Sequence, residues 1–222
     1  MTYRHAPLLA LIAASCWAPA QADPVTSVDP GIDARVITFS PYNAFTTAAV
    51  PALASTDVGT AEGFESVLLS FSDDSSERIL GAVPTDLGSN GAWPLNSAFA
   101  GLNAASGNMN FRFSRGMNFV GGFVNYRPNA FDGSVTLAAL DLYGNEIESD
   151  VLAFTDAAGS GQGEFRGFAS SGADIWGFAL SNGQVVIDNL TFGTNAISVP
   201  EPTSIALALV ALGALGASRR RR

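Results

Sequence analysis

The sequence has one cysteine, one histidine and no lysine, and this scarcity excludes several kinds of catalytic and metal-binding site. The cysteine and the histidine are Cys16 and His5, so both fall within the first 22 residues. The remainder of the chain therefore offers no disulfide, thiolate nucleophile, Cys/His zinc site or Ser-His-Asp triad. Without lysine there is no Schiff-base chemistry and no P-loop phosphate lysine. We therefore expect that the protein is not an enzyme.

Positive charge is also scarce over most of the chain. Between Asp23 and Val199, six arginines stand against 19 acidic residues, which gives this segment a net charge of −13. A field of this sign repels nucleic acid and argues against a groove that binds polyanions. It favours solubility outside the cell, and it is compatible with a divalent cation such as Ca²⁺.

The first 22 residues have the parts of a secretory signal peptide. A short polar stretch precedes residues 6–17, which are apolar apart from one serine, and small residues follow at the cleavage positions, Ala20 and Ala22. This order predicts that signal peptidase cuts before Asp23. A lipoprotein signal that ends at Cys16 is the alternative, although the preceding Ala-Ala-Ser lacks the usual leucine.

The last 25 residues also fall into three parts. Pro200-Glu201-Pro202 precedes an uncharged run, residues 203–218, and the chain ends in Arg219, Arg220, Arg221 and Arg222. As a helix, the uncharged run would span about 24 Å against a bilayer core of about 30 Å. Clustered arginines after such a run stay on the cytoplasmic side. The tail resembles the PEP-CTERM sorting signal of bacterial surface proteins; an ordinary C-terminal anchor is the alternative.

The resemblance implies that an exosortase, a membrane-embedded cysteine transpeptidase, recognises Pro200, Glu201 and Pro202 and removes the helix. The chain would be the substrate of that reaction, held in the membrane by its C-terminal helix until it is processed. We therefore expect export through the inner membrane and a final place at the outer cell surface or in the extracellular matrix. The expected division is a signal peptide (1–22), an ectodomain (23–197) and a sorting signal (198–222).

The ectodomain consists of short β-strand patterns separated by Gly, Asn, Asp and Ser turns. Met109, Phe111 and Phe113 alternate with polar residues, as in a half-buried strand. Asn182-Gly183 predicts a tight hairpin that joins residues 174–181 to 184–192. Short helices are conceivable only near residues 45–54 and 94–105. About eight to ten strands predict an antiparallel β-sandwich of jelly-roll type. The expected strands are 35–40, 67–72, 108–114, 119–126, 134–142, 147–155, 164–169, 174–181 and 184–192.

Three aromatic residues are candidate platforms for a sugar ring, because an aromatic face packs against pyranose C–H groups. They are Trp93, Tyr126 and Trp176. Trp93 lies in a Gly/Pro loop and is expected to be the most exposed, whereas a core position is the alternative for Trp176, which lies in a strand.

Asp188 is the candidate metal ligand. It is expected to share one face of a strand with Val186, Leu190 and Phe192. If that face is the core, its carboxylate must be paired, hydrogen-bonded or metal-bound, since an isolated buried charge is very costly. Calcium would need oxygen ligands from another loop acid, such as Asp132 or Asp174.

The strand at residues 185–193 resembles the last strand of many PEP-CTERM ectodomains, which are often lectin-like or similar to carbohydrate-binding modules. This resemblance implies a secreted, non-enzymatic protein that binds extracellular polysaccharide in an exopolysaccharide or biofilm matrix. A structural or protein-adhesive surface protein without a carbohydrate ligand is the alternative. Catalysis by paired carboxylates, at Asp73-Asp74 or at Glu146 and Glu148, is a remote third.

Overall fold

The computed structural model describes residues 22–28, 32–39, 56–59, 66–72, 78–82, 85–93, 98–155, 163–172 and 174–195. These residues contain thirteen strands and one short 3-10 turn, η2, and no α-helix. The elements are β1 (Asp23–Val25), β2 (Ile32–Ile37), β3 (Thr56–Gly59), β4 (Val67–Phe71), β5 (Arg78–Gly81), β6 (Thr85–Asp86), η2 (Gly88–Asn90), β7 (Ala92–Trp93), β8 (Phe99–Met117), β9 (Phe119–Tyr126), β10 (Thr136–Leu140), β11 (Glu146–Val151), β12 (Glu164–Ala169) and β13 (Ile175–Asn195).

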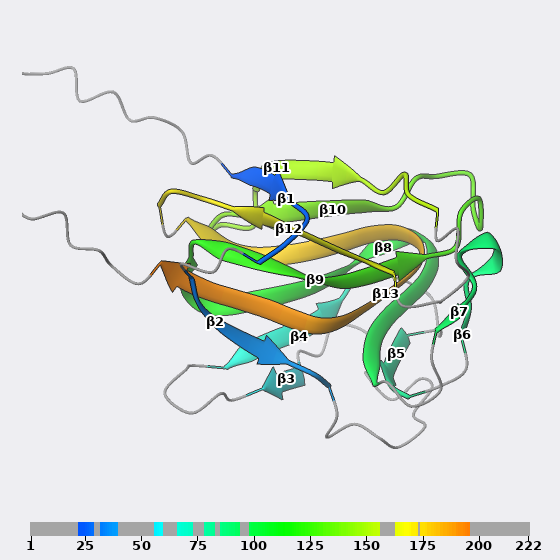
Figure 1. Ribbon diagram of the computed structural model, residues 1–222, viewed down its shortest axis with the longest axis horizontal. Coiled ribbons are helices and arrows are strands. Elements are labelled where there is room, and N and C mark those ends of the chain that lie inside the picture. Colours follow the sequence, from blue (N-terminus) through cyan, green and yellow to red (C-terminus); the bar gives the residue numbers. More distant parts are fainter. Residues whose placement is uncertain are drawn as a thin grey trace, which may run out of the picture.

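Two long strands, β8 and β13, give the molecule its two layers (Figure 1). They pair with each other over most of their length, and all the strand pairs are antiparallel. The first half of β13 and the second half of β8 form layer one with β10, β11, β4 and β3. The other halves form layer two with β9, β12, β1, β2 and β5. The predicted all-β, antiparallel sandwich is confirmed.

The hairpin predicted at Asn182-Gly183 is wrong, because both residues lie inside the continuous strand β13. Their φ angles are +60° and +89°, so the pair does adopt the left-handed conformation that its sequence favours. The register against β8 shifts here, with Ser181 opposite Asn108 but Gly183 opposite Ala104. The extra β8 residues form a bulge that bends both strands together, which carries them from one layer into the other.

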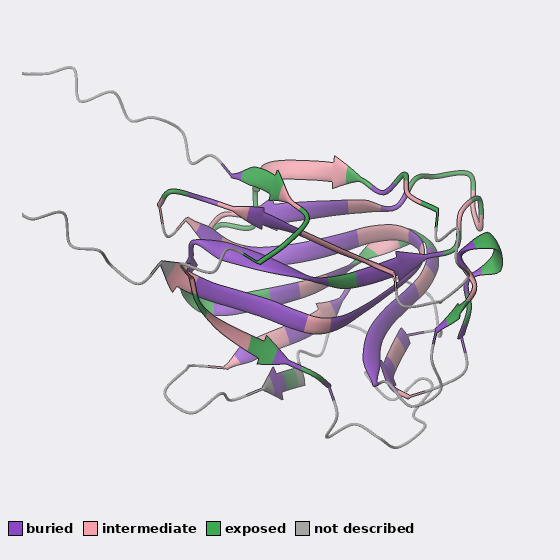
Figure 2. Cartoon of the chain, in the orientation of Figure 1, coloured by how far each residue is buried: buried purple, intermediate pink, exposed green. Residues whose placement is uncertain are grey.

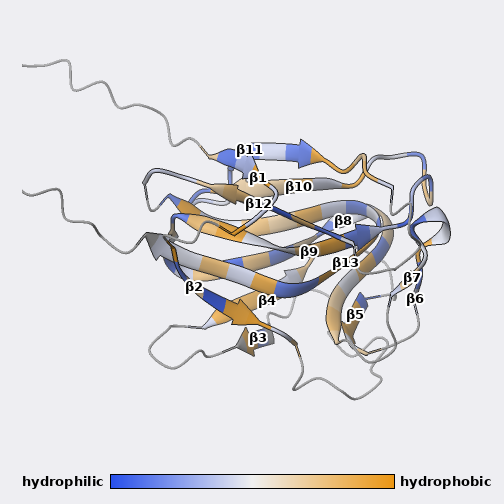
Figure 3. Cartoon of the chain, viewed as in Figure 1, coloured by the Kyte–Doolittle hydropathy of each residue, from blue (hydrophilic) through white to orange (hydrophobic). Residues whose placement is uncertain are grey.

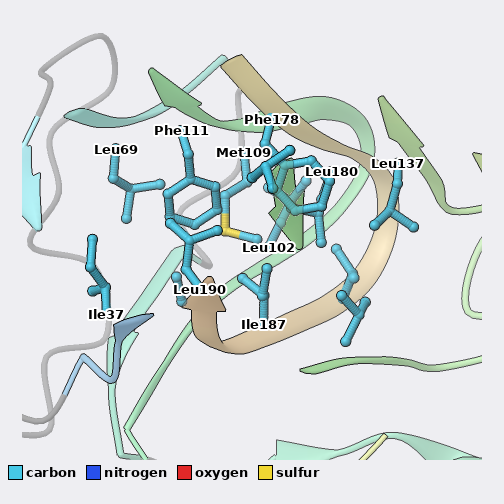
Figure 4. Close-up of a cluster of buried hydrophobic side chains, with 14 of the residues drawn as sticks. Ile37, Leu69, Leu102, Met109, Phe111, Leu137, Phe178, Leu180, Ile187 and Leu190 are labelled. Atoms are coloured by element: carbon cyan, nitrogen blue, oxygen red, sulfur yellow. The ribbon is translucent and has the colours of Figure 1, made fainter. Parts of the chain in front are cut away.

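The main core lies between the layers and confirms the alternation predicted for residues 108–114. Met109, Phe111 and Phe113 of β8 are at most 2% exposed. Pairs of rings join the layers: Phe113 lies 5.1 Å from Phe192, and Phe168 lies 6.2 Å from Phe178, between ring centroids. Figure 4 shows the centre of this cluster, where Met109, Phe111, Phe178 and Leu180 meet Leu102, Ile187 and Leu190.

A second, smaller cluster lies on the outer side of layer two. The β6–β7 pair and the η2 turn place Leu87 and Trp93 over Phe99 and Val186. Two buried amides fasten this cover to β9, because Asn90 Nδ2 donates to Tyr126 O (3.0 Å) and Asn125 Nδ2 donates to Asn90 O (3.2 Å). Most residues of β9 and β13 are accordingly buried (Figure 2).

Other local predictions have mixed outcomes. The expected strands at 134–142 and 147–155 are found as β10 and β11, which pair with each other. Strands at residues 119–126 and 164–169 have the predicted bounds. A helix within residues 99–105 is wrong, since they open β8. Residues 45–54, Asp73-Asp74 and residues 156–162 lie outside the described residues, as do residues 1–21 and the tail after Asn195.

Candidate functional site

Trp93 is not exposed, so the expectation from its Gly/Pro loop is wrong. Its side chain is 3% exposed and packs on Phe99, with ring centroids 5.8 Å apart. The β6–β7 pair folds back onto layer two and turns the indole inward. The indole Nε1–H is buried and makes no hydrogen bond with the residues that the structure describes.

Tyr126 is also a core residue, and Trp176 is half buried. Tyr126 is 7% exposed, and its hydroxyl donates to Phe154 O at 3.0 Å. Burial raises the pKa of this phenol, while the Arg166 charge acts in the opposite direction. Trp176 lies at the start of β13, at a register shift between Ile175 and Gly177. The structure does not bring the three predicted platforms together on one face.

Asp188 lies on the outer face of layer two, so its predicted face is wrong in part. The register of β13 against β9 shifts between Asp188 and Thr191, and Asn189 has a φ of +49°. This bulge reverses the alternation, so Leu190 and Phe192 point into the main core while Asp188 stays opposite Phe123.

The Asp188 carboxylate is 7% exposed and is hydrogen-bonded. Its Oδ1 accepts from the backbone N–H of Asn189 at 2.6 Å. Asp132 is exposed in a turn, and Asp174 Oδ2 accepts weakly from Ser170 Oγ at 3.4 Å. The described part of the chain contains no group of three or more Asp, Glu, His or Cys residues that could hold a metal ion.

A hollow with an exposed aromatic ring lies elsewhere, on the outer face of layer two. We call it the phenylalanine groove. It has a volume of about 870 Å³, and strands β9, β12, β13 and β2 supply its floor while residues 26–28 form a rim. Its central lining residues are Phe123, Phe165, Glu164, Arg166, Asn189 and Thr191.

Phe123 presents a ring to solvent in this groove. Its side chain is 42% exposed, and the other exposed apolar residues of the groove, Val28 and Val36, lie on the rim and on β2. Phe165 packs edge-on against Phe123 at 5.6 Å and stacks on the buried Phe119 at 6.0 Å. These contacts hold the exposed ring in a fixed position.

A glycine makes this arrangement possible. A Cβ atom on Gly121 would lie 2.8 Å from the Phe165 ring and 2.8 Å from the backbone oxygen of Arg166. Without that atom, Phe165 lies directly against the sheet, beside the close approach of strands β9 and β12.

Polar groups border the aromatic floor and leave it nearly neutral. Arg166 forms an ion pair with Glu164, and its guanidinium also lies 5.1 Å from the centre of the Phe154 ring. Asn189 and Thr191 lie on the other side of Phe123, on β13. An aromatic face with amide, hydroxyl and charged groups around it can bind a molecule that has both apolar and hydroxyl-bearing surfaces.

The sequence pattern could not have identified Phe123. It lies next to Val124, another apolar residue, so alternation does not tell which of the two faces solvent. Only the pairing settles this, since Gly122 packs against Ile187 on the core side and its neighbour must therefore face outward.

The described residues thus define the class of protein, an all-β antiparallel sandwich with an open groove on one face. Residues 198–222 match the PEP-CTERM protein-sorting motif, which confirms the resemblance of the tail. No curated protein and no solved structure matches the chain.

The motif implies export, processing by an exosortase and sorting to the cell surface. Among the residues that the structure describes, no helix is long and apolar enough to span a membrane; residues 203–218 are not among them. The predicted cleavage bond, between Ala22 and Asp23, lies at the start of β1. Cleavage there would leave β1 intact. It would also remove Ala22, which is 1% exposed, from the core.

Proposed function

We propose that this exosortase-sorted surface protein is not an enzyme and binds extracellular polysaccharide in the phenylalanine groove. The observation that carries the proposal is the fixed, 42%-exposed ring of Phe123 in an open groove bordered by amide, hydroxyl and charged side chains. Pyranose rings have apolar C–H faces and hydroxyl edges, which match an aromatic floor and a polar border.

Charge favours a polysaccharide with few anionic groups. The ion pair of Arg166 with Glu164 leaves no excess positive charge in the groove, and the ectodomain as a whole is strongly acidic. A polyanionic chain would therefore meet repulsion without a compensating cation. A neutral region of an exopolysaccharide is the better match.

The alternative, a structural protein that self-associates through its sheet edges, has less support. The edge strand β11 pairs only with β10 among the described strands, and it carries Glu146, Glu148 and Asp150. Charged side chains on an edge strand oppose pairing with another copy.

The test is co-sedimentation of the processed protein, collected from an exosortase-carrying host, with exopolysaccharide purified from the organism that makes the protein. We expect saturable binding by the wild type and at least a tenfold loss of affinity in Phe123→Ala, which corresponds to about 1.4 kcal/mol. Val151→Ala is the matched control, because Val151 is an equally apolar, 53%-exposed residue outside the groove. Absence of binding by the wild type would refute the proposal.

A further inference from the structure

A second groove of about 510 Å³ lies on the outer face of layer one, and we call it the asparagine groove. Four neighbouring strands, β10, β13, β8 and β4, build its floor and walls. Directly opposite one another across these strands are Ala138, Ala179, Asn110 and Ser70. The groove therefore runs across the strands of layer one and shares no residue with the phenylalanine groove.

Two polar side chains of this groove have donors and acceptors available for hydrogen bonds with a ligand. Asn108 and Asn110 alternate with the core residues Met109 and Phe111, so their amides point outward. Neither amide makes a hydrogen bond within the described part of the chain. An amide both donates and accepts, as adjacent sugar hydroxyls do, so the two chemistries are complementary.

The floor beside these amides, on β13 and β10, consists mainly of small residues, which lets a ligand approach the sheet. Ala138, Ala179 and Gly177 occupy its centre, and the Leu140 side chain lies beside Gly177. Arg112 and Glu146 also line the groove and bring opposite charges to it. A flat, uncharged molecule with many hydroxyl groups is therefore the ligand class that this surface fits.

A rigid hairpin turn borders the same groove. Arg112 NH2 donates to Leu142 O at 2.7 Å, and Asp141 Oδ1 accepts from the backbone N–H groups of Tyr143 and Asn145, each at 2.8 Å. Tyr143 is 84% exposed at this turn. The backbone of the turn is thus fixed where Gly144 lines the groove, and the exposed Tyr143 ring next to it offers a face for stacking.

We infer that the asparagine groove is a second saccharide site, so that one molecule bridges two polysaccharide chains. This inference rests on the proposed function for the first chain. The two grooves lie on the outward faces of two layers that pack with the main core between them. Packed sheets are about 10 Å apart, and a stiff chain bound to one outward face does not reach the other. Two sites that face apart make the protein a cross-linker of its matrix.

The test compares binding with cross-linking for the processed protein and the same purified exopolysaccharide. Binding is measured by co-sedimentation, and cross-linking is measured by the rise in viscosity at a fixed polysaccharide concentration. We expect the wild type to do both. Asn108→Ala/Asn110→Ala is expected to keep the Phe123-dependent binding, to halve the saturating amount of polysaccharide bound per protein, and to abolish the rise in viscosity.

Ser114→Ala is the matched control, because Ser114 is exposed on the same face of β8 beyond the groove. Phe123→Ala is expected to lose cross-linking but to keep weaker binding through the asparagine groove. Adding Asn108→Ala/Asn110→Ala to Phe123→Ala should remove that remaining binding. Asn110→Asp, which keeps the shape and removes the N–H donors, is expected to act like the double substitution. Unchanged thermal unfolding would show that the variants are folded.

Two results separate this inference from the proposed function. If Asn108→Ala/Asn110→Ala leaves both stoichiometry and viscosity unchanged while Phe123→Ala abolishes binding, the second site is refuted and the first stands. If the wild type binds no polysaccharide, both proposals are refuted. A protein with one saccharide site could also cross-link polysaccharide by associating with itself. In that case the asparagine substitutions would leave the rise in viscosity unchanged, and this outcome would refute the second site.

Discussion

At the scale of single residues, Gly121 decides whether the exposed ring of the phenylalanine groove is supported. The space that its missing side chain leaves is filled by Phe165, which in turn packs against Phe123. The close neighbours of a Cβ atom at this position include backbone, which cannot move aside as the end of a flexible side chain can. A larger residue at position 121 would therefore affect both the binding of a ligand and the stability of the fold.

Gly121→Ala is expected to destabilise the protein by about 1–3 kcal/mol, because the added methyl group overpacks the contact between β9 and β12. It is also expected to weaken polysaccharide binding by displacing Phe165. Thermal or denaturant unfolding and co-sedimentation measure the two effects. Gly133→Ala is the control, since its Cβ atom would meet nothing closer than 4.0 Å. Equal stability of the two variants would contradict the role given to Gly121.

At the scale of elements, the Asn-Gly pair in β13 shows what local sequence can and cannot predict. Asn182-Gly183 correctly indicated positive φ angles. A hairpin and a bend in a continuous strand use the same local conformation, and they differ only in which strands pair. Here β8 bends alongside β13, and this partner lies more than 60 residues earlier in the chain. A local pattern does not contain that information.

The same limit applied to Asp188 and to the aromatic candidates. Alternation placed Asp188 on the same face as Leu190 and Phe192, whereas the bulge at Asn189 puts those two residues on the opposite face. Trp93 was expected to be exposed because it lies in a Gly/Pro-rich segment, but this segment folds back and packs Trp93 against Phe99. Strands with strict alternation, such as residues 108–114, were predicted correctly because one face is core and the other is solvent.

The β10–β11 hairpin turn is expected to persist to low pH. Hydrogen bonds from the Asn145 side chain, and then from backbone N–H groups of the turn, lower the pKa of Asp141 below its ordinary value of 3.8. A carboxyl whose folded pKa is lowered stabilises the turn above the unfolded pKa and loses this effect as pH falls through the folded pKa. NMR signals of Tyr143 and Asn145 should therefore stay constant from pH 7 down to the ordinary value and change only below it.

Asn145→Ala tests the cause of that shift. It removes the side-chain donor that lies 3.0 Å from Asp141 Oδ2, so the pKa of Asp141 should rise toward its ordinary value. Ser149→Ala is the comparison, because its hydroxyl donates to Glu146 at 2.6 Å and not to Asp141. An Asp141 that titrates at the ordinary value in the wild type would contradict the structure of the turn.

At the scale of the whole molecule, the distribution of polar and apolar surface separates two tasks. Apolar residues fill the space between the layers, while polar residues dominate the edge strand β11 and the turns (Figure 3). The sorting motif determines where the protein goes, and the described sandwich presents two grooves of different character. A protein concentrated at a surface by its tail must also resist pairing of its sheet edges with those of its neighbours.

The acidic edge of β11 is expected to keep the molecules apart. Glu148→Gln/Asp150→Asn removes two charges from this edge and should cause concentration-dependent self-association, measured by analytical ultracentrifugation. Asp132→Asn/Asp174→Asn removes the same net charge from turns and should leave the protein monomeric, because the effect depends on the edge and not on total charge. High salt should also promote association of the wild type, since an ionic strength above 0.15 M shortens the range of charge repulsion to less than about 8 Å. If both pairs of substitutions cause equal association, net charge and not the edge is what keeps the protein dispersed.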